Sequence, residues 1–196
     1  MNIANKLTVA RLISVPVFMI VMLLPESLIS LRTACLIGAV IFIAASVTDA
    51  LDGHLARKHH LVTDFGKFFD PLADKFMVIG ALFVILYRFE SLRLYVLILT
   101  VTVVFRELAV TSARLVASTS KEKVVIPANI YGKIKTVLQI VFVSSVLIEH
   151  ALWADICPFL LGYPISIISM IGAFVMTIWS GGVYLYNCRK YITTTK

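Results

Sequence analysis

Four aspartates in one short stretch are the residues of this sequence best suited to chemistry. Asp49 and Asp52 lie three residues apart, and Asp70 and Asp74 lie four residues apart. On helices, these spacings place the two members of each pair on one face. Carboxylates that lie close together repel each other and resist full ionisation unless cations neutralise them. Hard oxygen ligands suit Mg²⁺ or Mn²⁺, so the pattern predicts a site for two divalent cations.

Apolar runs flank this stretch, with residues 36–47 before it and residues 76–86 after it. Two hydrophobic helices would therefore each present two carboxylates near a shared turn. The alternative is that the aspartates are ordinary loop and cap residues, as Asp64 would be at a helix start. That alternative does not explain four carboxylates at helical spacing beside apolar spans, where ionisable groups are costly.

The composition is that of a membrane protein. Of 196 residues, 60% are hydrophobic and only 15% are charged, and the mean hydropathy is +0.95. These values predict an all-α integral membrane protein, with one domain over residues 1–196. The net charge of +7 fits a positive cytoplasmic face better than a nucleic-acid partner, so no nucleic acid is expected. Three widely separated cysteines indicate neither a disulfide framework nor a zinc site, and no cleavable signal peptide is expected.

Six stretches are each close to the roughly 20 residues needed to cross a bilayer. An even number of spans places both termini on one side, which leaves only Arg32, Arg88 and Arg93 of the 18 basic residues on the other side. This bias predicts a multi-pass protein of the cell membrane whose termini and aspartates face the cytoplasm. The expected spans are Leu7–Leu24, Leu31–Val47, Gly66–Leu86, Leu92–Ala117, Gly132–Ile148 and Pro164–Tyr186.

The aspartates belong to a longer pattern, Asp49-x2-Asp52-Gly53-x2-Ala56-Arg57-x8-Gly66-x3-Asp70-x3-Asp74. This pattern and the six-span layout resemble the CDP-alcohol phosphatidyltransferase family. The resemblance implies the CDP-alcohol phosphotransferase fold, a CDP-diacylglycerol substrate and two divalent cations. It assigns the cations to Asp49, Asp52, Asp70 and Asp74, and the general base to Asp74. It assigns the cytidine nucleotide to Asp49, Asp52, Gly53, Ala56, Arg57 and Gly66.

Transfer of a phosphatidyl group from CDP-diacylglycerol to an alcohol would need carboxylates and divalent cations. The charge of a pyrophosphate must be neutralised before an alcohol can attack it. The attacking hydroxyl must also lose a proton, which a carboxylate within hydrogen-bond reach can accept. The expected step is attack on the lipid-side phosphorus, with CMP leaving.

Basic residues outside the pattern bear on the identity of the acceptor. Arg106 and Arg114 lie inside an apolar span, eight residues apart and roughly on one face. Glu107 follows Arg106, but adjacent helical residues do not share a face, so a bound anion is the expected partner of the arginines. Several stretches are similar to those of bacterial family members that use sn-glycerol 3-phosphate. On that resemblance, the candidates for holding the acceptor phosphate are Thr8, Arg11, Arg106, Arg114, Lys133 and Lys135.

Other interpretations remain open at this point. Within the same family, the acceptor could be inositol phosphate or serine. Outside it, an intramembrane prenyltransferase or a divalent-cation transporter would also use clustered carboxylates. A homodimer is the expected assembly, although small residues such as Gly38 and Gly80 would serve close contacts within the bundle equally well.

Overall fold

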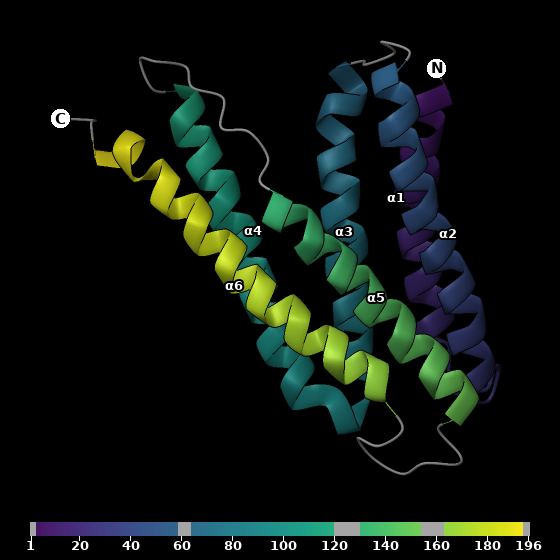
Figure 1. Ribbon diagram of the computed structural model, residues 1–196. Helices are drawn as coiled ribbons and strands as arrows, with labels where there is room; N and C mark the ends of the chain where they lie inside the picture. The colour runs from purple at the N-terminus through teal and green to yellow at the C-terminus, as the bar shows by residue number, and fades with distance from the viewer. Residues whose placement is uncertain (1–2, 59–63, 120–129, 154–162, 194–196) are drawn as a thin grey trace.

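The computed structural model describes residues 3–58, 64–119, 130–153 and 163–193, and all regular structure within these ranges is helical (Figure 1). This confirms the expected all-α class. The elements in chain order are α1 (Ile3–Leu23), α2 (Leu31–Lys58), α3 (Asp64–Arg88), the short 3-10 helix η1 (Glu90–Leu92), α4 (Arg93–Thr119), α5 (Ile130–Trp153) and α6 (Pro164–Thr193).

Four segments of the described chain are long and apolar enough to cross a membrane. They are Leu31–Asp49, Glu90–Val116, Ile130–Trp153 and Pro164–Cys188. The apolar part of α1 is shorter, Leu7–Leu23, and the first half of α3 carries charged residues. A multi-pass membrane protein is therefore supported, while the count of six spans and the cytoplasmic orientation of the termini stay predictions.

Successive helices run in opposite directions along the bundle (Figure 1). As a result, α1 begins, α2 ends, α3 begins and α6 ends at the same end of the bundle. We call this the aspartate end, because Asp49, Asp70 and Asp74 lie on its part of α2 and α3. The opposite end, where α5 ends and α6 begins, is called the far end.

Helix α1 packs closely against α2 and α3 because glycines face it. A Cβ added at Gly38 would lie 2.8 Å from Met22 Sδ, and one added at Gly80 would lie 3.2 Å from Val15 Cγ1. Both distances are shorter than ordinary van der Waals contacts, so a Cβ at either position would force the facing side chain of α1 to move. The close packing places the beginning of α1 beside the aspartates of the other two helices.

The far end is held by a carboxylate that caps α6 from another helix. Glu149 on α5 is 3% exposed and accepts hydrogen bonds from the backbone N–H groups of Ile165 at 2.8 Å and Ser166 at 3.0 Å. It also accepts one from the Ser166 hydroxyl. A negative charge at a helix N-terminus is favourable and satisfies N–H groups that have no partner within the helix.

Glu149→Ala should therefore lower the free energy of unfolding by about 1–3 kcal/mol, because it leaves the N–H groups of Ile165 and of the buried Ser166 without an acceptor. Thermal unfolding of the detergent-purified protein measures this. Glu90→Ala is the control, since Glu90 is exposed and contacts only Arg93 at 3.4 Å among its described ion pairs, and should change stability by about 0.5 kcal/mol or less. Equal stabilities of the two variants would contradict the role of Glu149.

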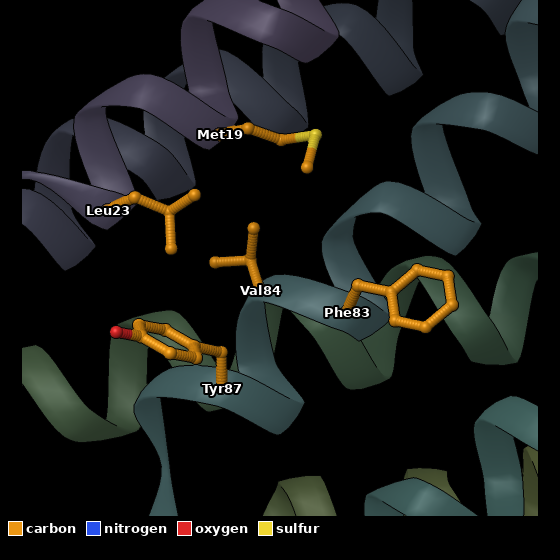
Figure 2. A pocket seen from close by; sticks show the side chains of 5 residues that line it. All are labelled: Met19, Leu23, Phe83, Val84 and Tyr87. Carbon is orange, nitrogen blue, oxygen red and sulfur yellow. The ribbon is translucent and has the colours of Figure 1, made fainter.

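A pocket of about 340 Å³ lies between α1 and α3. Figure 2 shows its lining side chains, Met19, Leu23, Phe83, Val84 and Tyr87. Apart from the Tyr87 hydroxyl, these side chains carry no oxygen or nitrogen. Phe83 follows Asp74 by nine residues, or about 13 Å along a helix. The pocket is thus apolar and distant from the aspartates, and it is unsuited to a charged nucleotide.

Candidate active site

Arg11 brings together one aspartate from each pair of the pattern. Its Nη1 lies 2.7 Å from Asp49 Oδ1 and 3.1 Å from Asp74 Oδ1. The three residues come from α1, α2 and α3 respectively. The Arg11 side chain is only 2% exposed, whereas those of Asp49 and Asp74 are 35% and 44% exposed. Two carboxylates from different helices therefore converge on one cationic nitrogen and remain partly open to solvent.

Asp70 faces the same helix as Asp74. Its Oδ1 accepts a hydrogen bond of 2.5 Å from the Thr8 hydroxyl. Thr8 and Arg11 are three residues apart on α1, and Asp70 and Asp74 are four apart on α3, so the contacts follow matching faces of the two helices. The helical spacing of this aspartate pair is thus realised, and α1 supplies the side chains that contact it.

The remaining nucleotide-site candidates are only partly visible. Asp52, Gly53, Ala56 and Arg57 lie on the last two turns of α2, and their side chains are outside the described part of the structure. Gly66 is buried in the first turn of α3. The roles assigned to these five residues stay predictions.

The donor atoms of this region suit a hard divalent cation. Among the described side chains, no three His, Cys, Asp or Glu residues gather as metal ligands, but Asp52 is not among those side chains. Asp49 and Asp74 already face one cationic atom. Carboxylate oxygens are the ligands that Mg²⁺ and Mn²⁺ prefer, so the residues present fit such an ion.

A second charged cluster surrounds Glu107 on α4. Lys135 of α5 donates a hydrogen bond to Glu107 Oε1, and Arg106 Nη1 lies 3.0 Å from the same oxygen. Lys75 Nζ of α3 lies 3.9 Å from Glu107 Oε2 and donates to the Thr111 hydroxyl at 2.6 Å. We call Lys75, Arg106, Glu107 and Lys135 the Glu107 cluster. Its Lys75 directly follows Asp74 in the chain, so the cluster reaches α3 at the residue next to that aspartate.

One expectation from the sequence is wrong here. Glu107 was not expected to pair with its neighbour Arg106, because adjacent helical residues point in different directions. The arginine side chain is long enough to bend around the helix and reach the carboxylate. Lys75 and Glu107 were not among the candidate residues. The signal that could have found them is a charge within an apolar helix, which is the criterion that selected Arg106.

Gly181 of α6 makes room for the Arg106 side chain, and Gly132 of α5 lies beside its guanidinium. A Cβ at Gly132 would lie 3.6 Å from Arg106 Nη2, and one at Gly181 would lie 3.1 Å from Arg106 Cγ. Within the described part of the structure, Arg106 Nε is buried and has no hydrogen-bond partner. The guanidinium is therefore held in a narrow space with one donor unused.

The other two basic candidates lie elsewhere. Arg114 Nε donates to the Tyr184 hydroxyl at 3.2 Å, and its guanidinium carbon lies 5.5 Å from the centroid of the Tyr184 ring. Arg114 is thus placed against α6, about two turns along α4 from Arg106. Lys133 is exposed near the start of α5. The structure brings Arg106 and Lys135 together on Glu107 and places Thr8 and Arg11 on the aspartates.

Known proteins are similar to this chain over nearly its whole length. Residues 1–179 match the family described as CDP-alcohol phosphatidyltransferase. A Bacillus subtilis (strain 168) protein named CDP-diacylglycerol–glycerol-3-phosphate 3-phosphatidyltransferase is 42% identical over 202 residues, covering 99% of this chain and 98% of its own length. Proteins of the same name from Rickettsia felis and Haemophilus influenzae are 36% and 33% identical, covering 97% and 94% of this chain and 97% and 91% of their own lengths.

Proposed function

The chain belongs to the CDP-alcohol phosphatidyltransferase family, and on that premise we propose that it transfers the phosphatidyl group of CDP-diacylglycerol to sn-glycerol 3-phosphate and releases CMP. The family resemblance of the aspartate pattern is confirmed. The names of the similar proteins support this choice of substrates. The observation that carries the proposal is the convergence of Asp49 and Asp74 on Arg11, next to the basic Glu107 cluster.

The family generally depends on divalent metal ions. Asp49, Asp52, Asp70 and Asp74 are the residues that would hold two such ions. When bound, these ions would neutralise the pyrophosphate charge and favour departure of CMP. Asp52, Gly53, Ala56, Arg57 and Gly66 are proposed to bind the nucleotide together with Asp49.

Asp74 is proposed as the general base. Its carboxylate would accept the proton of the acceptor hydroxyl as that oxygen attacks the lipid-side phosphorus. A new phosphorus–oxygen bond forms, and the bond to CMP breaks. Arg11 holds Asp74 Oδ1 at 3.1 Å and Thr8 holds Asp70 Oδ1 at 2.5 Å. These contacts from α1 orient both carboxylates of α3 before substrate arrives.

Arg106 and Lys135 are proposed to hold the acceptor phosphate. Both contact Glu107, which also pairs with Lys75, the neighbour of Asp74 in the chain. Arginine and lysine both bind phosphate oxygens by charge-assisted hydrogen bonds. Thr8, Arg11, Arg114 and Lys133 remain proposed contributors. Inositol phosphate carries the same kind of group and is the main alternative acceptor, whereas serine has no phosphate group for these cations to bind.

The activity test uses detergent-purified protein with CDP-diacylglycerol, Mg²⁺ and one acceptor at a time. CMP release should depend on sn-glycerol 3-phosphate and exceed the rates with inositol phosphate, serine or no acceptor. A faster reaction with another acceptor, or CMP release without any acceptor, would contradict the proposal.

Two further experiments test the orientation and the assembly. Reconstitution into vesicles with protease protection would test the proposed cytoplasmic orientation, and light scattering would test the proposed homodimer.

A pair of adjacent glycines offers a matched test of the Arg106 position. Gly181→Ala should weaken apparent binding of glycerol 3-phosphate roughly fivefold, equivalent to about 1 kcal/mol, because the new methyl group would press on Arg106 Cγ. Gly182→Ala is the control, since a Cβ there meets no atom within 4 Å. Measured KM values for the acceptor decide the outcome. Equal KM values in the two variants would show that the Arg106 position does not govern acceptor binding.

A further inference from the structure

Glu107 is the anion on which the basic side chains of three helices meet. Lys135 and Arg106 both contact its Oε1, and Lys75 lies 3.9 Å from its Oε2. The side chains of Lys135 and Arg106 are 6% and 14% exposed. A buried cation needs a nearby opposite charge, because removal of that charge leaves its desolvation uncompensated. Glu107 therefore holds these cations in place.

The charges of the Glu107 cluster do not cancel. Three basic side chains and one carboxylate leave a net charge of three minus one, or +2. A phosphate monoester carries a charge of about −1.5 to −2 near neutral pH. A dianionic phosphate would neutralise the cluster, whereas a neutral or zwitterionic alcohol would leave its positive charge uncompensated.

One residue of the Glu107 cluster, Lys75, is the chain neighbour of the proposed base Asp74. Lys75 is joined to Asp74 by one peptide bond, and it also contacts Thr111 on α4 at 2.6 Å. The cluster therefore reaches α3 at the residue next to the proposed base, at which the hydroxyl of the acceptor has to react. Glu107 itself is 13% exposed and is occupied by its cations, so it is not suited to accept the hydroxyl proton.

We propose that Glu107 is a positioning residue that fixes Lys135 and Arg106 for the acceptor phosphate and sets the charge of the site to select a dianionic phosphate monoester. This inference rests on the proposed function. A purely structural role of Glu107 would affect binding of both substrates, whereas the proposed role affects binding of the acceptor and not of the CDP-linked lipid.

The first test removes the charge of the Glu107 side chain and keeps its shape. Glu107→Gln should raise the KM for glycerol 3-phosphate about tenfold or more, because Lys135 and Arg106 lose the carboxylate that holds them in place. The KM for CDP-diacylglycerol should change by less than about twofold. The preference for glycerol 3-phosphate over glycerol, expressed as a ratio of kcat/KM values, should fall. Glu90→Gln, an exposed far-end glutamate, should leave all of these values unchanged.

The second test asks whether Glu107 acts through Lys135. Lys135→Met should by itself raise the KM for glycerol 3-phosphate at least tenfold, and adding Glu107→Gln should raise it little further. Residues that act as one unit are non-additive in this way, whereas independent effects multiply. An unchanged acceptor KM in Lys135→Met would overturn the proposal even if Glu107→Gln fails to fold. Equal increases in the KM of both substrates would overturn it as well.

A binding measurement separates this inference from the proposed activity. Inorganic phosphate should raise the thermal unfolding temperature of the wild-type protein, and Glu107→Gln should need about tenfold more phosphate for the same rise. Equal phosphate dependence in the two proteins would overturn the role of Glu107. Failure of the proposed function would instead appear as wild-type protein without CMP release that depends on glycerol 3-phosphate, and the phosphate titration would still decide the role of Glu107.

Discussion

Asp74→Asn is expected to lower the rate of CMP release by about 10²- to 10⁴-fold, the usual contribution of a positioned general base. The amide keeps the size of the side chain and its place beside Arg11, but it cannot accept the proton of the acceptor hydroxyl. Binding of the nucleotide should remain largely intact. Initial rates with both substrates saturating measure the first effect, and calorimetric titration with CDP measures the second.

The matched control for this substitution is Glu26→Gln. It is the same change from acid to amide at an exposed residue, whose described ion pair is a 3.8 Å contact with Arg88. Its rate should equal that of the wild-type protein. A rate of Asp74→Asn near the wild-type value would show that another group takes the proton.

Arg11→Met is expected to give the largest loss of stability. It removes a guanidinium that is 2% exposed and leaves the carboxylates of Asp49 and Asp74 without their shared cation. Breaking a fully buried ion pair from one side costs about 3–5 kcal/mol, and because Asp49 and Asp74 are partly exposed, we expect a loss of about 3 kcal/mol. Thermal unfolding in detergent with a chelator should show this loss, and Mg²⁺ should reduce it, because a divalent ion can replace the missing positive charge between the carboxylates.

Arg93→Met provides the comparison for Arg11. The Arg93 side chain is 52% exposed and pairs with Glu90 on the surface, so its loss should cost about 1 kcal/mol or less. If the two arginine variants unfold at the same temperature, the contacts of Arg11 do not stabilise the bundle. If Mg²⁺ stabilises Arg11→Met no more than the wild type, the carboxylates do not share a divalent ion.

The helices and the aspartate faces were predictable because they follow from local patterns. Hydropathy located the apolar segments, and the spacing of Asp70 and Asp74 placed them on one face of α3. Hydropathy did not give the full length of the helices. Helix α2 continues to Lys58, through the polar residues that follow its apolar part, because backbone hydrogen bonding does not require an apolar side chain.

The partners of the charged residues were less predictable because they depend on packing between distant segments. Thr8 and Asp70 are 62 residues apart, and Arg11 and Asp74 are 63 apart. Sequence reasoning proposed Thr8 and Arg11 for the acceptor phosphate, which stays a prediction, and it did not foresee their contacts with aspartates. Glu149 was not considered, since its partners lie 16 and 17 residues away across a change of helix.

Asp74 and Lys75 follow one another on α3, and they link the aspartates around Arg11 to the Glu107 cluster. Neighbouring residues of an α-helix point about 100° apart, and here one contacts α1 while the other contacts α4. Any turning of α3 about its own axis would move both side chains together, away from the positions of these contacts. On the proposed function, a rotation of α3 would therefore disturb the proposed base and the proposed acceptor-phosphate site at the same time.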